Sequence, residues 1–173
     1  MSENSEILSL LSEEGALQEG SGHSSPRIVV LLGGKSRFFD FPTGWYTAAM
    51  HYLCDTLGDP GGCMVLVSSL DTPVWALDTD VPGVAEAPLV TVRRDSQEQD
   101  SYQAQLAAAL TWAEGIVITP DNMEMAEVAC ASGKPVFLTG GDLAKGRLFS
   151  FYRRLKQDGC LRPLDDLKQL VCQ

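Results

Sequence analysis

The stretch GIVITPDNMEMAEVACASGKPVFLT, residues 115–139, decides the fold. It opens with a short apolar run rich in β-branched residues, which is typical of a buried strand. Asp121 and Glu124 have the spacing of a capping box, so we expect a helix over 121–132. Gly133 suits the left-handed position that ends a helix, and a second apolar run follows it. The stretch therefore predicts a strand–helix–strand unit with parallel strands.

The same alternation continues on both sides of this unit. Strands are predicted over 28–32, 64–67, 89–92, 116–118 and 136–138. Helices are indicated by apolar side chains at helical spacing. These side chains are Trp45, Ala49, Tyr52 and Leu53; Tyr102, Leu106, Ala109 and Leu110; and Leu148, Phe151, Tyr152 and Leu155, the last set in a helix over 142–158. The pattern predicts an α/β domain with a parallel sheet of about five strands and helices on both faces.

Composition bounds the domain organisation and excludes several classes of function. The chain has 173 residues, of which 45% are hydrophobic, so one domain with a full core is expected. Residues 1–26 are expected to form an acidic flexible tail or linker, or a docking segment, ahead of a domain over 27–173. The formal net charge of −10 argues against binding nucleic acid or an anionic membrane. Without a long apolar run, we expect a cytoplasmic protein with no transmembrane segment.

Cysteine and histidine usage argues against a disulfide framework, a metal site and nucleophilic catalysis. The five cysteines are widely spaced and odd in number, namely Cys54, Cys63, Cys130, Cys160 and Cys172. This pattern is typical of reduced thiols. The two histidines, His23 and His51, lie away from strand ends and lack ligand spacing. We therefore predict no catalytic residue and no metal ligand.

Three turns follow predicted strands, and the carboxyl ends of parallel strands meet at one edge of a sheet. The first turn contains Gly33 and Gly34, whose backbone amides could approach a phosphate with help from Ser36 and Arg37. The spacing matches neither a Walker A motif nor G-x-G-x-x-G. The turn is thus either an anion contact or a tight turn with solvated basic residues.

The second turn leads into the helix predicted at Asp121, and the third follows the last predicted strand. Carboxylates in the first turn of a helix stabilise its dipole and repel an incoming anion, so this helix start could be merely self-capped. The alternative is that Asn122, Met123 and Glu127 hydrogen-bond a ribose or sugar hydroxyl. The third turn holds two glycines before Asp142, a predicted N-cap. The whole predicted ligand-binding set is Gly33, Gly34, Ser36, Arg37, Thr119, Asp121, Asn122, Met123, Glu127, Gly140 and Gly141.

Four blocks of the chain carry a resemblance to a known family. They are residues 30–36 (VLLGGKS), 118–121 (ITPD), 129–136 (ACASGKPV) and 149–163, which ends in GCLRP. Over about 27–164 the chain is similar to the C-terminal half of the mitochondrial-fission "elongated mitochondria" family, whose members occur in plants and many bacteria. The combination of blocks is specific, whereas each block alone is not.

The resemblance implies a glycosyltransferase-B-like architecture, in which two Rossmann-like domains face each other. The C-terminal domain of such proteins holds the nucleotide-sugar donor, and this chain looks like that domain without its acceptor-side counterpart. The resemblance thus implies a domain that binds a nucleotide or nucleotide diphosphate-sugar and is not catalytic alone. One departure stands out, because the usual ribose-binding glutamate position, counted back from Gly133, holds Val128, with Glu127 beside it.

Two alternatives remain open at this point. The plant branch of the family is implicated in recruiting a dynamin-related GTPase to the outer surface of mitochondria. The resemblance is therefore also compatible with a non-enzymatic adaptor, located peripherally on the mitochondrial outer membrane in a eukaryote. The other alternative is the donor subunit of a split glycosyltransferase, which would need a separate acceptor-domain protein as partner.

Overall fold

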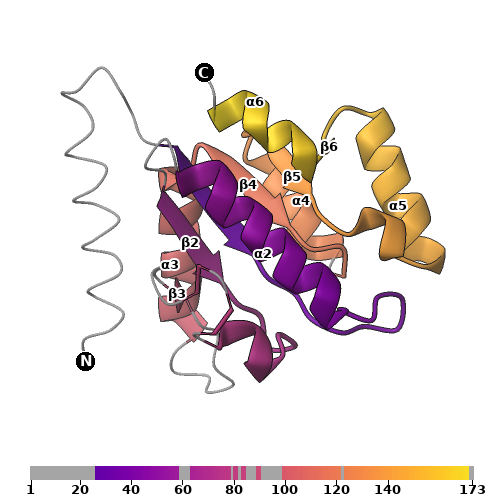
Figure 1. The fold of residues 1–173 in the computed structure, drawn as a ribbon. Helices are drawn as coiled ribbons and strands as arrows, with labels where there is room; N and C mark the ends of the chain where they lie inside the picture. The colour runs from indigo at the N-terminus through magenta and orange to yellow at the C-terminus, as the bar shows by residue number, and fades with distance from the viewer. Residues whose placement is uncertain are drawn as a thin grey trace.

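The computed structural model describes residues 26–58, 63–78, 80–81, 83–84, 89–90, 99–121 and 123–171. The predicted tail over 1–26, apart from Pro26, lies outside these ranges, as do Asn122 and Cys172. Figure 1 shows a twisted central sheet with helices packed against it. The strands are β1 (Arg27–Leu31), β2 (Cys63–Val67), β3 (Leu89–Val90), β4 (Gly115–Ile118), β5 (Val136–Leu138) and β6 (Arg162–Pro163).

The strands form one parallel sheet in the order β3-β2-β1-β4-β5-β6. The parallel α/β class and the five predicted strands are confirmed, with residues 91–92 of the strand predicted over 89–92 lying outside the described ranges. The two-residue strand β6 is an addition, because a run as short as Arg-Pro carries no periodic signal. This strand order is that of a Rossmann-like fold, and it reverses direction between β1 and β4. Ligands of such sheets bind beside that reversal, outside the carboxyl ends of the strands.

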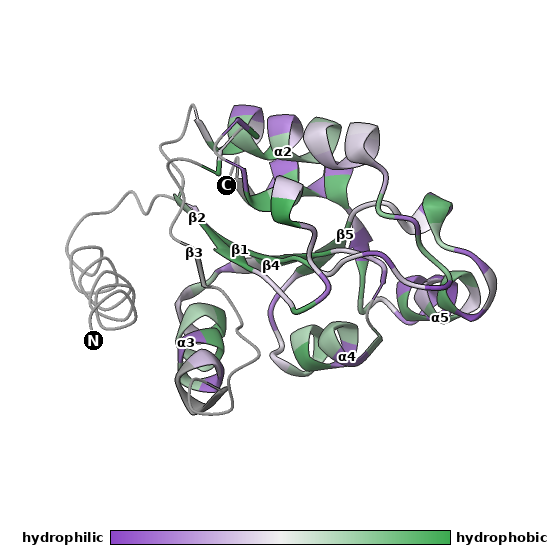
Figure 2. Ribbon diagram, turned by 90° about the horizontal axis from the view of Figure 1, so that it is seen from below, coloured by the Kyte–Doolittle hydropathy of each residue, from purple (hydrophilic) through white to green (hydrophobic). Residues whose placement is uncertain are grey.

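Helices cover both faces of the sheet (Figure 2). Helix α2 (Thr43–Gly58) lies on one face, where it contacts α6 (Leu167–Val171). Helices α3 (Gln99–Trp112) and α4 (Met123–Ala131) lie on the other face. The central strands are buried from both sides, and Ile28, Ile116 and Phe137 are each 0% exposed. Their apolar character on both faces is what a parallel sheet between two helical layers requires.

The buried face of α2 differs from the predicted one by a rotation of one residue. Of the predicted side chains, Leu53 packs into the core, whereas Trp45, Ala49 and Tyr52 are only partly buried. The other buried residues of the helix are Tyr46, Met50 and Leu57. The prediction failed here because α2 has two adjacent apolar faces, and periodicity alone does not tell which one meets the sheet.

The long C-terminal helix begins later than predicted. Helix α5 spans Gly146–Gln157, and a separate 3₁₀ helix, η2 (Gly141–Leu143), precedes it. Gly140, the N-cap of η2, and Gly146, the first residue of α5, have positive φ angles of 80° and 56°, so a single right-handed helix does not run through either position. Asp142 therefore lies inside η2, and Lys145 is the N-cap residue of α5. The segment 164–171 forms a 3₁₀ turn, η3 (Leu164–Asp166), followed by α6.

Candidate functional site

The turns after β1 and β4 meet at the reversal of strand order, and their polar groups bind one another. The amide of Gly33 donates to Thr119 Oγ1 at 2.8 Å, and the amide of Gly34 donates to Asp121 Oδ2 at 2.9 Å. The hydroxyl of Thr119 in turn donates to Asp121 Oδ1 at 2.6 Å. We call these four residues the switch-point cluster. Their side chains and amides hold together positions more than 80 residues apart in the chain.

The carboxylate of Asp121 occupies the place that an anionic ligand would take at the glycine turn. A Cβ atom on Gly33 would lie 1.9 Å from both carboxylate oxygens, so glycine is needed for this close approach. The capping box expected from the sequence is not formed. The Asp121 carboxylate accepts hydrogen bonds from Gly34 and Thr119 instead, and α4 begins only at Met123. The amides of Gly33 and Gly34 are therefore already used.

A third loop closes this crevice from the side of β2. Thr72 Oγ1 donates to the carbonyl oxygen of Gly33 at 2.8 Å and lies 3.2 Å from that of Leu32. The backbone of Asp71 packs so closely that a Cβ on Gly34 would lie 1.8 Å from its carbonyl oxygen. Loops after β1, β2 and β4 thus form one tightly bonded unit, which leaves the usual phosphate position filled by protein.

Burial raises the pKa of Asp121 above its ordinary value, and nearby Asp71 acts in the same direction. The folded state therefore binds the Asp121 proton more tightly than the unfolded chain does. The resulting contribution to stability is present at low pH and is lost as pH rises through the folded-state pKa.

We therefore expect the wild type to lose stability relative to Asp121→Asn as pH rises from about 4 to about 7, since asparagine does not titrate. Urea unfolding of both proteins at several pH values measures the difference. Asp142→Asn, which removes an exposed carboxylate, is the matched control. A wild type that gains stability over Asp121→Asn across this range would contradict the assignment.

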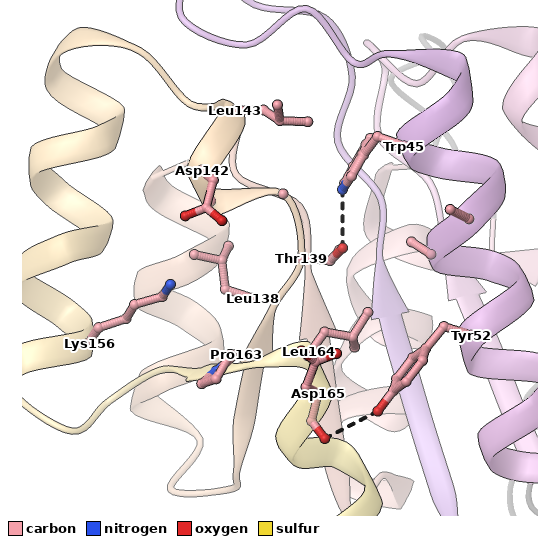
Figure 3. A pocket seen from close by; sticks show the side chains of 14 residues that line it. Trp45, Tyr52, Leu138, Thr139, Asp142, Leu143, Lys156, Pro163, Leu164 and Asp165 are labelled. Atoms are coloured by element: carbon pink, nitrogen blue, oxygen red, sulfur yellow. Dashed lines mark hydrogen bonds between the residues drawn. The ribbon is translucent and has the colours of Figure 1, made fainter.

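A groove of ≈ 460 Å³ lies one strand further along the carboxyl edge, between α2 and the ends of β5 and β6 (Figure 3). We call it the α2–β5 groove. Its lining residues are Trp45, Ala48, Ala49, Tyr52, Leu138, Thr139, Gly140, Gly141, Asp142, Leu143, Lys156, Pro163, Leu164 and Asp165. Its volume is within the range of small-molecule sites.

The second apolar face of α2 forms one wall of the α2–β5 groove. Trp45 Nε1 donates to Thr139 Oγ1 at 3.2 Å, and the hydroxyl of Tyr52 donates to the carbonyl oxygen of Asp165 at 3.2 Å. These bonds fix both rings across the groove. A Cβ at Gly140 would lie 2.7 Å from the indole of Trp45, so a larger residue there would fill the space.

The opposite wall of the groove carries charge. Lys156 projects from α5 toward η2, and its Nζ would lie 3.7 Å from a Cβ built on Gly141. Asp142 projects from η2 toward the same region (Figure 3). The groove thus combines aromatic rings, a hydroxyl, a glycine turn, an ammonium group and carboxylates. Such a mixture suits a ligand with a flat ring, hydroxyl groups and an anionic part.

The predicted binding residues separate into groups. Gly140 and Gly141 line the α2–β5 groove. Ser36 is paired with Phe39 in a short antiparallel bridge, and the guanidinium of Arg37 lies over the ring of Phe38 at 5.6 Å. Neither Ser36 nor Arg37 lines the groove.

The remaining predicted contacts lie on other surfaces. Met123 and Glu127 are exposed on α4, on the far side of the sheet from α2. Of the basic residues near the third turn, Lys145 donates to Asp40 Oδ2 at 2.9 Å and Arg147 lies over Phe38. The lysine lowers the pKa of Asp40 through this bond.

The groove depends on residues that were not predicted as ligand contacts, above all Trp45, Tyr52 and Lys156. The aromatic pair was assigned to the core because it lies at helical spacing. The sequence did contain a signal for the groove wall, since α2 has more apolar residues than a single buried face requires. Nothing in the sequence brings Lys156 to η2, because that contact depends on where α5 begins.

The described part of the chain lacks two kinds of feature. None of its helices has both the length and the apolar character needed to cross a membrane. The described residues also contain no group of three or more His, Cys, Asp or Glu side chains placed to hold a metal ion.

The fold and the carboxyl-edge groove define an α/β protein of the Rossmann-like class. The family model for mitochondrial fission ELM1 matches residues 9–172, so the chain belongs to the mitochondrial fission ELM1 family. Mitochondrial fission protein ELM1 from Arabidopsis thaliana is 32% identical over 68 residues, which are 39% of this chain. The match spans only 15% of that relative's length.

Solved structures with a similar fold include two YcaC proteins. The YcaC gene product from Escherichia coli, described as an octameric hydrolase of unknown specificity, has a TM-score of 0.51 and 15% identity, over 83% of this chain and 78% of its own. YcaC from Pseudomonas aeruginosa has a TM-score of 0.50 and 14% identity, over 83% and 79%. At this level of identity the likeness shows the fold alone.

Proposed function

We propose that this domain binds a nucleoside diphosphate or a nucleotide sugar in the α2–β5 groove and does not transfer the sugar alone. The single observation that carries the proposal is a groove of suitable volume at the carboxyl edge of a Rossmann-like sheet, walled by aromatic rings. The predicted residues Gly140 and Gly141 belong to it. Catalysis of sugar transfer would require an acceptor domain on the other side of this edge.

Each part of such a ligand has a matching group in the groove. Trp45 and Tyr52 offer ring faces and edges to a base or sugar. Asp142 and Asp165 are acceptors for hydroxyl groups, and the ammonium of Lys156 attracts phosphate. The proposal thus moves the phosphate contact away from Gly33 and Gly34, whose amides bind Thr119 and Asp121. Repulsion by the Asp121 carboxylate favours this displacement.

Isothermal titration calorimetry tests the proposal with uridine, guanosine and adenosine diphosphates and their sugars. We expect heat with at least one ligand, and about tenfold weaker affinity in Lys156→Gln, because a hydrogen bond to a charged group is lost. Arg153→Gln removes the same charge from an exposed position on the same helix outside the groove, and serves as the matched control. Equal affinities in the two variants would exclude the α2–β5 groove as the site.

A second candidate function is protein binding at the carboxyl edge, as in an adaptor or a split transferase. Large apolar side chains that follow strand ends are exposed there, namely Leu70 at 52%, Val74 at 89%, Trp75 at 37%, Met123 at 37% and Leu143 at 43%. Exposed apolar groups gathered along one edge are a mark of interaction sites. The titration separates the two candidate functions. Absence of heat with every nucleotide at millimolar concentration would exclude nucleotide binding and favour protein binding.

A further inference from the structure

Two of the cysteines are brought together by the ends of two different helices. Cys130 lies in the last turn of α4 and is half-buried, whereas Cys160 is exposed just after α5. The Sγ atom of Cys130 lies 3.8 Å from the carbonyl oxygen of Cys160. The two residues are about 30 positions apart, so only the tertiary fold makes them neighbours.

Both positions are held by helix-terminating glycines. After α5, the amide of Cys160 donates to Leu155 at 2.9 Å and Gly159 donates to Lys156 at 3.1 Å, with Gly159 at φ 80°. These paired bonds are a Schellman motif, which fixes the backbone of Cys160. After α4, Gly133 takes the left-handed conformation with φ 77°. Neither thiol therefore depends on a loose loop for its placement.

We propose that Cys130 and Cys160 form an oxidation site, at which a peroxide converts the two thiols into a reversible intramolecular disulfide. The placement of one sulfur against the backbone of the other cysteine carries this inference. Disulfides outside secreted proteins are typically transient and redox-sensing, which fits a pair of thiols near a protein surface. The proposal is independent of the nucleotide site.

The chemistry proceeds in two balanced steps. The exposed Cys160 thiolate attacks hydrogen peroxide and breaks the O–O bond, which gives a sulfenic acid and hydroxide. The hydroxide takes up the proton that the Cys160 thiol released on ionisation and becomes the first water. The Cys130 sulfur then attacks the sulfenic sulfur, and the departing hydroxide takes up the Cys130 proton as a second water. The two sulfurs lose two electrons and the peroxide oxygens gain them. Burial raises the pKa of the Cys130 thiol, which suits the more protected role of the second, resolving cysteine.

The disulfide would join the end of α4 to the segment that enters β6. Pro163 of β6 lines the α2–β5 groove, and Leu164 and Asp165 follow it there. Oxidation would thus restrain the chain on one side of the groove without blocking it. Because the bond closes a loop of about 30 residues, we expect the oxidised protein to melt about 5–10 °C higher than the reduced protein.

The test treats the reduced full chain with a small excess of hydrogen peroxide, alkylates the remaining thiols and maps the peptides by mass spectrometry. We expect a linked Cys130–Cys160 peptide, its loss on adding dithiothreitol, and the rise in melting temperature only in the oxidised form. Cys160→Ser should abolish both effects, and Cys130→Ser should leave a trapped sulfenic acid. Cys63→Ser, which removes a half-buried thiol elsewhere, should keep both effects.

Three results would overturn the proposal. The first is the absence of the linked peptide at peroxide levels that oxidise Cys160. The second is a disulfide of Cys160 with any other cysteine, or between two chains. The third is a rise in melting temperature that persists in Cys160→Ser, because the stabilisation would then come from another modification.

Discussion

Gly34→Ala is expected to lower the free energy of unfolding by about 3 kcal/mol. The new Cβ would lie 1.8 Å from the carbonyl oxygen of Asp71, and that atom belongs to backbone, which cannot rotate away. The loop after β2 would have to move, and the hydrogen bonds from Thr72 to Leu32 and Gly33 would be strained with it. Urea unfolding at neutral pH measures the loss.

Gly44→Ala is the matched control for Gly34→Ala. Gly44 lies in the first turn of α2, and a Cβ there meets no atom within 4 Å. Alanine at a helical position is more favourable than glycine, so this variant should be unchanged or more stable by up to about 1 kcal/mol. If both alanine variants lost the same stability, the loss would come from glycine replacement in general and not from the contact with Asp71.

Tyr46→Ala is expected to cost about 4 kcal/mol of stability, the range typical of removing a buried aromatic ring. Tyr46 is 1% exposed, with ring centroids 5.3 Å from Phe41 and 5.6 Å from Trp75. Its hydroxyl donates to the carbonyl oxygen of Ala76 at 2.7 Å. The Tyr46 side chain therefore packs α2 against the 3₁₀ helix η1 (Val74–Leu77). Its removal leaves a cavity beside the α2 wall of the α2–β5 groove.

Tyr46→Phe separates the contribution of the hydroxyl from that of the ring, and Tyr52→Phe is its control. Tyr46→Phe keeps the ring and should cost about 1–2 kcal/mol, because the buried carbonyl of Ala76 loses its donor. Tyr52→Phe removes a hydroxyl whose bond to Asp165 is exposed, so its effect should stay within about 0.5 kcal/mol. Urea unfolding of all three variants gives the values. A Tyr46→Phe variant as unstable as Tyr46→Ala would assign the whole effect to the hydrogen bond.

The fold was predictable because its signals are local. The four strands with three or more apolar residues (β1, β2, β4 and β5), the C-terminal end of α4 and the parallel class each depend on neighbouring residues. The start of α5 was not predictable, since a helix tolerates glycine at a cost of only about 1 kcal/mol, and the sequence does not show that Gly140 and Gly146 take positive φ angles. Which face of α2 meets the sheet was also undecided, because both faces are apolar.

The candidate site was predictable in its place but not in its contacts. In a parallel sheet, the turns that follow the strands meet at one edge. Gly33, Thr119 and Asp121 do meet there. The sequence left open whether the glycine amides face a ligand or the protein. In the structure the amide of Gly34 faces the protein, because it donates to the carboxylate of Asp121, 87 positions away. No local sequence pattern encodes a contact at that separation.

From its sequence alone this protein is an α/β domain of a fission-family type, because helix caps, apolar runs and family blocks are properties of short segments. Tertiary structure alone decided that a carboxylate fills the phosphate position, that Trp45 and Lys156 face one groove, and that Cys130 lies beside Cys160. The physical reason is common to all three. Each is a contact between residues far apart in the chain, fixed only when helices pack on the finished sheet.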